Sequence, residues 1–175
     1  GKRVVRLKGG DPYTFGRGGE ETAELAAASI RFEVVPGVSS ATAAPNYAGI
    51  PLTHRDHCAS FTVLTGHEDP DASDPELNWA LLARQPGTKV VMMGLKNLRR
   101  IMERLQSEGL DPATPVAMIR WGTTPRQQTL QGTVATIADL AEQQRFGAPA
   151  ITVIGNVVSL RTQLNWFESR PLFGR

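Results

Sequence analysis

The residues best suited to bind a ligand lie in a glycine-rich segment near the start of the chain, residues 7–21 (LKGGDPYTFGRGGEE). Glycine lets a ligand lie directly against the backbone, because no Cβ atom stands in the way. The segment follows the β-branched residues 4–7, which predict a buried strand. It precedes the alanine-rich residues 20–28, which are acidic in the first turn and predict a helix. A loop between a strand and a helix lies at the carboxyl edge of a parallel sheet, where α/β folds bind ligands.

A second strand–loop–helix step follows directly. Residues 30–35 (IRFEVV) predict a strand that ends at a Pro-Gly turn dipeptide. Ser39 and Ser40 then offer N-caps for a helix over residues 41–48. Both loops follow predicted strands, so we expect them to border the same crevice of a parallel α/β arrangement.

The rest of the chain continues as alternating strands and helices. Residues 49–56 form an irregular link, and we therefore expect two domains, residues 1–56 and residues 57–175. Beyond the link, strands are predicted over residues 60–66, 89–93, 115–119, 127–132 and 149–155, and helices over residues 79–84, 98–105, 136–141 and 159–166.

Length, charge and composition limit the class of protein. The chain has 175 residues, of which 41% are hydrophobic, and its formal net charge of +2 is too small to indicate a nucleic-acid-binding surface. The single cysteine, Cys58, cannot form an internal disulfide, and no apolar run approaches the ~20 residues of a membrane span. We therefore expect a cytoplasmic protein with no membrane or nucleic-acid partner.

No metal site is predicted. The three histidines, His54, His57 and His67, lack cysteine or carboxylate partners at the spacing of a zinc site. The acidic residues 68–76 lack the glycine and the distal glutamate of a calcium loop, so we interpret them as a solvated loop.

The spacing of residues in two segments does not match the motifs of two other enzyme classes. Residues 54–56 read His-Arg-Asp, as in protein kinases, but Phe61 stands where the kinase motif has asparagine. The glycines of residues 9–19 do not follow the G-x-G-x-x-G spacing of a nicotinamide-dependent dehydrogenase. Neither activity is expected.

Five blocks of the sequence resemble the uroporphyrinogen-III C-methyltransferases of the tetrapyrrole methylase family, which also form the C-terminal part of sirohaem synthase. The blocks occur in order and span nearly all of the chain. They are GGDPYTFGRGGEE, VVPGVSSATAAPNYAGIPLTHRD, VVMMGLKNL, TPVAMIRWGT and PAITVIGNVVSLR. The resemblance implies a tetrapyrrole methylase fold, with two α/β domains, S-adenosylmethionine (AdoMet) in the cleft between them, and a homodimer. The family's opening strand and Gly-Pro-Gly-Asp-Pro loop have no counterpart here, so the first domain is expected to be incomplete.

The resemblance also implies an activity. Members of the family methylate carbon atoms of uroporphyrinogen III to give precorrin-2 through precorrin-1, releasing S-adenosylhomocysteine, for sirohaem or cobalamin biosynthesis. Two alternatives remain open, namely another precorrin methyltransferase of the superfamily and an inactive fragment that only binds the cofactor. The implied cofactor-binding residues are Gly9, Gly10, Asp11, Thr14, Ser39, Ser40, Met93, Ala117 and Met118.

The negative charge of the substrate that the resemblance implies indicates which residues are expected to bind it. Uroporphyrinogen III carries eight carboxylates, and a guanidinium group pairs with a carboxylate through two parallel hydrogen bonds. Arg17 in the glycine-rich loop and Arg55 in the link are the expected substrate-binding residues, with Arg17 also taking part in catalysis. Once a ring carbon has been methylated it must lose a proton, and Glu20 is the expected general base.

Overall fold

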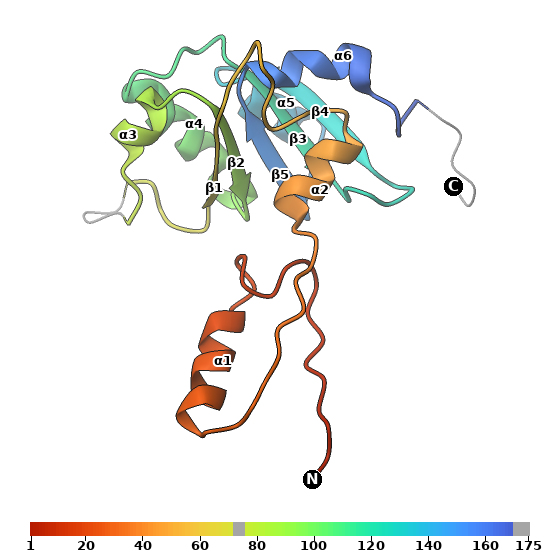
Figure 1. The fold of residues 1–175 in the computed structure, drawn as a ribbon. Helices are drawn as coiled ribbons and strands as arrows, with labels where there is room; N and C mark the ends of the chain where they lie inside the picture. Colours follow the sequence, from red (N-terminus) through yellow and green to blue (C-terminus); the bar gives the residue numbers. More distant parts are fainter. Residues whose placement is uncertain (72–75, 170–175) are drawn as a thin grey trace. The chain divides into compact units, whose positions relative to one another are not determined.

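The computed structural model describes residues 1–71 and 76–169 of the chain (Figure 1). These residues form two compact units, Gly1–Ser40 and Ala41–Arg175. The domain boundary expected between residues 56 and 57 concerns the fold of the whole family, and it stays a prediction. Among the described residues, no helix has the length and apolar character needed to cross a membrane.

The first unit contains one helix, α1 (Gly18–Ala27), with an irregular segment on either side. The helix prediction for residues 20–28 is therefore confirmed. Helix α1 is favoured by its alanines and by two carboxylates in its first turn. The second of these, Glu21, also binds the preceding segment, because it accepts hydrogen bonds from Arg6 at 3.1 Å and from Lys8 at 2.8 Å.

The prediction of strands over residues 4–7 and 30–35 is wrong. Neither segment forms a strand, and both expose large apolar side chains, with Val4 and Val5 at 87% and 86% exposure. A strand needs a neighbour to accept and donate its backbone hydrogen bonds. Within the described part of the chain neither segment has one, so β-branched composition alone does not produce a sheet here.

The second unit is built on a five-stranded sheet (Figure 1). All five strands expected after residue 57 are present. Strands β1 and β2 are parallel, whereas β5 is antiparallel to β2 and β3, and β4 is antiparallel to β3, so the sheet is mixed. The strands are β1 (Phe61–Thr65), β2 (Thr88–Met92), β3 (Pro115–Arg120), β4 (Gln128–Thr133) and β5 (Ala150–Ile154), in the order β1-β2-β5-β3-β4.

Helices cover both faces of this sheet. One core cluster packs α3, α4 and α5 against one face, and the other packs α2 and η2 against the opposite face. The predicted helices are confirmed, except that the last becomes a 3₁₀ turn followed by a short α-helix. The helices are α2 (Ser40–Tyr47), α3 (Trp79–Arg84), η1 (Leu95–Asn97), α4 (Leu98–Ser107), α5 (Ile137–Gln143), η2 (Asn156–Leu160) and α6 (Arg161–Leu164).

Strand β3 shows why this part of the sequence was predictable. Successive side chains of a strand point to opposite faces of the sheet. Val116 and Met118 accordingly belong to one core cluster, and Ala117 and Ile119 belong to the other. Because both faces are covered, the strand is a continuous apolar run.

Arg161 of α6 and Glu168, in the segment after α6, link the residue that follows α2 to the edge strand β4. Arg161 is 7% exposed, and its guanidinium donates to the backbone oxygen of Ala48 and to the Glu168 carboxylate. The same carboxylate accepts from Gln127 at 2.8 Å and from Thr129 at 2.6 Å. This buried network holds the C-terminal end of α2 in place.

Candidate functional site

The C-terminal ends of β1, β2 and β3 lie on the same side of the sheet. We call this side, where the strands end, the sheet edge, as distinct from the edge strand β4. Strands β1 and β2 are parallel, and β3 runs in the same direction as β2 because both are antiparallel to β5. The register confirms this, since Ile151 pairs with Met92 on one side and with Ile119 on the other. The residues after β2 and β3 therefore lie at the same edge of the sheet, with β5 between the two strands, and this is the edge where an α/β sheet binds ligands.

The backbone is strained at this edge. Met93 follows β2 with φ 56°, and Trp121 and Thr123 follow β3 with φ 48° and 68°. Such left-handed conformations are unfavourable for residues other than glycine and are concentrated at functional sites. The Met93 side chain is 51% exposed, so a ligand can reach it.

Residues 121–123 are part of this edge and were missed by the sequence analysis. Gly122 lies between the two strained residues, and a Cβ atom built on it would lie 2.5 Å from the Cβ of Ala44 in α2. The turn after β3 therefore touches α2, the helix whose first residue is Ser40. A glycine shortly after the strand predicted over residues 115–119 was the signal that could have drawn attention to this turn.

Ala117 and Met118, by contrast, lie inside β3. Both are fully buried, and their side chains belong to the two opposite core clusters. Neither side chain is therefore exposed at the sheet edge, where a ligand could contact it. The role of these two residues in cofactor binding stays a prediction.

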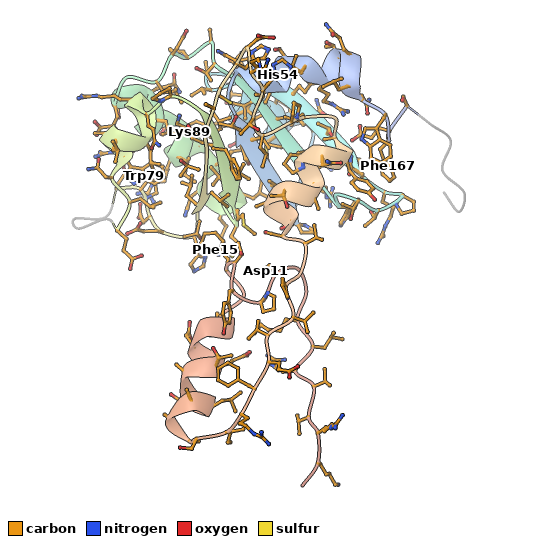
Figure 2. The ribbon with its side chains drawn as sticks, in the orientation of Figure 1. Asp11, Phe15, His54, Trp79, Lys89 and Phe167 are labelled. Carbon is orange, nitrogen blue, oxygen red and sulfur yellow. The ribbon has the colours of Figure 1, made fainter. Side chains whose placement is uncertain are left out.

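In the first unit, the two loops expected to border one crevice do come together. The Asp11 carboxylate, labelled in Figure 2, accepts a hydrogen bond from the backbone N–H of Gly37 at 3.1 Å. It also accepts from the backbone N–H of Tyr13 at 2.9 Å and from the hydroxyl of Thr14 at 3.0 Å. The Gly37 N–H, more than the Thr14 hydroxyl, lowers the pKa of Asp11 below its usual value. The loop of residues 36–40 is thus tied to the glycine-rich loop.

Gly9 presents open backbone to a ligand, whereas Gly10 lies against the loop of residues 36–40. No described atom lies within 4 Å of a Cβ built on Gly9, and Gly10 has φ +70°, a conformation that favours glycine. Backbone N–H groups and nearby hydroxyls suit the carboxylate and ribose of AdoMet, and an exposed methionine suits an aromatic ring. The residues present therefore fit this cofactor chemically.

Arg17 and Glu20 bind each other. Nη2 of Arg17 lies 2.7 Å from Oε2 of Glu20, and Nε lies 3.2 and 3.1 Å from the two carboxylate oxygens. Both side chains are exposed, at 79% and 65%. The hydrogen bond and the charge of Arg17 lower the pKa of Glu20, so this carboxylate is ionised in near-neutral solution. The guanidinium expected to hold substrate and the carboxylate expected to remove a proton are therefore one ion pair.

Arg55 belongs to the second unit, in the link between α2 and β1. Its side chain is exposed. The neighbouring residues interact with one another, since Nδ1 of His54 lies 3.8 Å from the Asp56 carboxylate and the His54 and His57 rings are 5.1 Å apart.

Among the described residues, no group of three or more histidine, cysteine or carboxylate side chains is arranged to hold a metal ion. Part of the acidic segment 68–76 lies outside the described residues, but Asp69 and Asp71 pair with Arg100.

These features describe an α/β protein with strained backbone after β2 and β3 in its second unit and two tied loops in its first unit. Residues 1–138 match the model of the tetrapyrrole (corrin/porphyrin) methylases. The chain belongs to this family.

Individual relatives agree with the family match. The chain is 56% identical, over 91% of its length, to a Methanosarcina barkeri protein named S-adenosyl-L-methionine-dependent uroporphyrinogen III methyltransferase. It is 51% identical, over 97% of its length, to a siroheme synthase of Azotobacter vinelandii. The crystal structure of a uroporphyrin-III C-methyl transferase from Thermus thermophilus, complexed with S-adenyl homocysteine, matches with a TM-score of 0.76 and 34% identity, over 90% of this chain and 67% of that one. The chain spans 63% of the Methanosarcina protein and 36% of the Azotobacter protein.

Proposed function

We propose that the protein is an AdoMet-dependent C-methyltransferase that converts uroporphyrinogen III to precorrin-2 through precorrin-1, in sirohaem or cobalamin biosynthesis. The observation that carries this proposal is the 56% identity to the Methanosarcina protein named for that activity, over 91% of the chain. AdoMet, when bound, supplies an electrophilic methyl group on a positively charged sulfur. The chain's own residues have to hold it, orient the macrocycle and accept a proton.

In this proposal the cofactor-binding residues are those that the family resemblance implies, some in the first unit and some in the second. Gly9 and Gly10 offer backbone N–H groups, Ser39 and Ser40 offer hydroxyls, and Met93 offers an exposed thioether. Asp11, Thr14, Ala117 and Met118 complete the set that the resemblance implies. The strained backbone at residues 93 and 121–123 supports this assignment, because strain of this kind is found where ligands bind.

Arg17 and Arg55 are proposed to bind carboxylates of the macrocycle. Arg17 is already paired with Glu20 at 2.7 Å, so a substrate carboxylate would compete with Glu20 for the guanidinium. A substrate with eight carboxylates is well able to do so, because a guanidinium offers five N–H donors and can hold more than one partner. Substrate binding would then remove the Arg17 guanidinium from one side of the Glu20 carboxylate.

Glu20 is proposed to accept the proton released after methyl transfer. As the methyl carbon bonds to the ring carbon, the carbon–sulfur bond breaks and its electron pair stays on sulfur, which gives S-adenosylhomocysteine. The methylated ring carbon then releases a proton, and an ionised carboxylate nearby can accept it. In the protein without substrate, Arg17 lowers the pKa of Glu20, so this carboxylate is already ionised when the substrate binds.

The remaining parts of the proposal concern assembly and location. We propose two domains divided near residue 56, with the cofactor between them, in a homodimer located in the cytoplasm. The family resemblance and the ordinary composition of the chain support these points.

The proposal is tested by incubating the intact protein with AdoMet carrying a ¹³C-labelled methyl group and with uroporphyrinogen III, and by measuring the products by mass spectrometry. Two labelled methyl groups per macrocycle, with two equivalents of S-adenosylhomocysteine, are expected. Transfer only to an already methylated precorrin would favour another methyltransferase of the superfamily. Cofactor binding without transfer would favour a binding function.

A further inference from the structure

We infer that Asp11 is a positioning residue whose carboxylate fastens the turn at Gly37 to the glycine-rich loop, and so fixes the backbone surface on which the cofactor binds. The carboxylate itself does not contact the cofactor. The inference rests on the proposed function for the identity of the ligand, but the fastening can be tested with no ligand present.

Both oxygen atoms of the carboxylate are used by donors of this chain. Oδ1 accepts from the backbone N–H of Tyr13 at 2.9 Å and from the hydroxyl of Thr14 at 3.0 Å. Oδ2 accepts from the backbone N–H of Gly37, which is 26 residues further along the chain, at 3.1 Å. Hydrogen bonds to an ionised carboxylate are about twice as strong as those between neutral groups. The arrangement therefore joins two distant loops through one side chain.

An independent observation shows how closely these loops meet. A Cβ built on Gly37 would lie 1.9 Å from the backbone oxygen of Gly10 and 3.3 Å from the Cα of Asp11. No side chain fits at this position, so the two backbones are in direct contact. The contact involves Gly10, one of the residues expected to face the cofactor, and a shift of Gly37 would therefore move the binding surface.

The charge of Asp11 sets the pH range in which the fastening holds. The pKa of Asp11 is lowered, first by the Gly37 N–H and then by the Thr14 hydroxyl. A carboxyl group whose pKa is lower in the folded state stabilises that state above its ordinary pKa of about 3.9, and this contribution is lost as the pH falls through the lowered value. At neutral pH the fastening is therefore fully formed.

The first experiment measures amide hydrogen exchange in the intact protein without ligand. Asp11→Asn keeps one acceptor oxygen and replaces the other with an N–H₂ group that cannot accept, so the Gly37 N–H must compete with the Tyr13 N–H and the Thr14 hydroxyl for a single neutral oxygen. We expect the Gly37 amide to exchange at least tenfold faster at neutral pH, while Glu33→Gln, which removes an exposed carboxylate from the same unit, leaves its exchange unchanged. Thr14→Val removes only the hydroxyl donor and is expected to have a smaller effect, which keeps the test informative if Asp11→Asn folds poorly.

The second experiment measures the affinity for S-adenosylhomocysteine by calorimetry and the steady-state kinetics. For Asp11→Asn we expect the dissociation constant to rise by about tenfold to a hundredfold, the loss typical of a hydrogen bond to a charged group. The KM for AdoMet should rise in parallel, with kcat and the KM for uroporphyrinogen III within about twofold of the wild-type values, a split that a general loss of stability would not produce.

Two results would overturn the inference. If Asp11→Asn lost affinity while the exchange of Gly37 stayed at the wild-type rate, the carboxylate would act directly on the ligand. If exchange became faster while affinity did not change, the fastening would have no role in binding. A wild-type protein that did not bind S-adenosylhomocysteine would instead refute the proposed function, and the exchange experiment would still decide whether the fastening exists.

Discussion

The contact between Gly122 and α2 provides a sharp test of the sheet edge as the cofactor site. In Gly122→Ala the new methyl group would lie 2.5 Å from the Cβ of Ala44 and 3.1 Å from its Cα. Carbon atoms in contact are normally ~3.5–4.0 Å apart, so α2 or the turn after β3 must move by about 1 Å. Adding a methylene-sized group to a packed site costs about 1–3 kcal/mol, which corresponds to a fall in Tm of roughly 2–12 °C for a chain of this length.

The matched variant moves the methyl group from one side of the contact to the other. Ala44→Gly removes the opposing Cβ, and we expect the double variant Gly122→Ala/Ala44→Gly to recover stability beyond the sum of the single changes. The recovery will be incomplete, because glycine inside a helix costs about 0.5–1 kcal/mol relative to alanine. Thermal unfolding and the affinity for S-adenosylhomocysteine are measured for all four proteins, and Gly122→Ala is expected to bind about tenfold more weakly. Unchanged stability and affinity in Gly122→Ala, or strictly additive effects in the double variant, would refute the reasoning.

Four further predictions concern the charged groups. Arg17→Ala and Arg55→Ala should each raise the KM for uroporphyrinogen III at least tenfold with little change in the KM for AdoMet, because each removes a donor to substrate carboxylates. Glu20→Gln should lower kcat while the affinity for S-adenosylhomocysteine stays near the wild-type value. Since Arg17 lowers the pKa of Glu20 in the protein without substrate, Arg17→Ala should also move the acidic limb of the kcat/KM–pH profile to higher pH. Glu168→Gln should lower the free energy of unfolding in urea by about 2–4 kcal/mol, because it leaves the buried guanidinium of Arg161 without its counter-charge.

Exposed residues elsewhere in the chain provide controls for these measurements. Arg31→Ala removes an exposed arginine from the first unit, and Glu103→Gln removes an exposed carboxylate from α4; neither should change the kinetics or the stability. Equal changes in both KM values would contradict the assignment of the arginines to the substrate. Full activity of Glu20→Gln would end its role as the base, and a wild-type unfolding curve for Glu168→Gln would show that the buried ion pair adds no stability.

The second unit was largely predictable because its sequence carries local signals. Strands β2, β3 and β5 are short apolar runs bounded by glycine or proline. Helix α4 has apolar residues at helical spacing and is followed by Gly109, which has φ +103°. Residues 4–7 and 30–35 carry an equally clear signal, but they form no strand. Strand formation depends on a hydrogen-bonding neighbour as well as on composition, and no sequence window contains that information.

The site was predicted less completely, for a related reason. The loops at Gly10 and Ser39 were expected to meet and do so, but the carboxylate that joins them acts across 26 residues and leaves no local pattern. Of the implied cofactor-binding residues in the second unit, Met93 follows β2, but Ala117 and Met118 lie in the middle of β3 and are buried on opposite faces of the sheet. The backbone that a ligand could reach lies after the C-terminal end of β3, and in the sequence Gly122 is the sign of the turn there.

A crystal structure of the intact protein with S-adenosylhomocysteine tests the central claim most directly. The account predicts the methionine and ribose end of the ligand against the backbone of Gly9 and Gly10 and the hydroxyls of residues 39–40. The adenine should lie against Met93 and the turn of residues 121–123. A ligand bound away from this sheet edge and from the glycine-rich loop would contradict it.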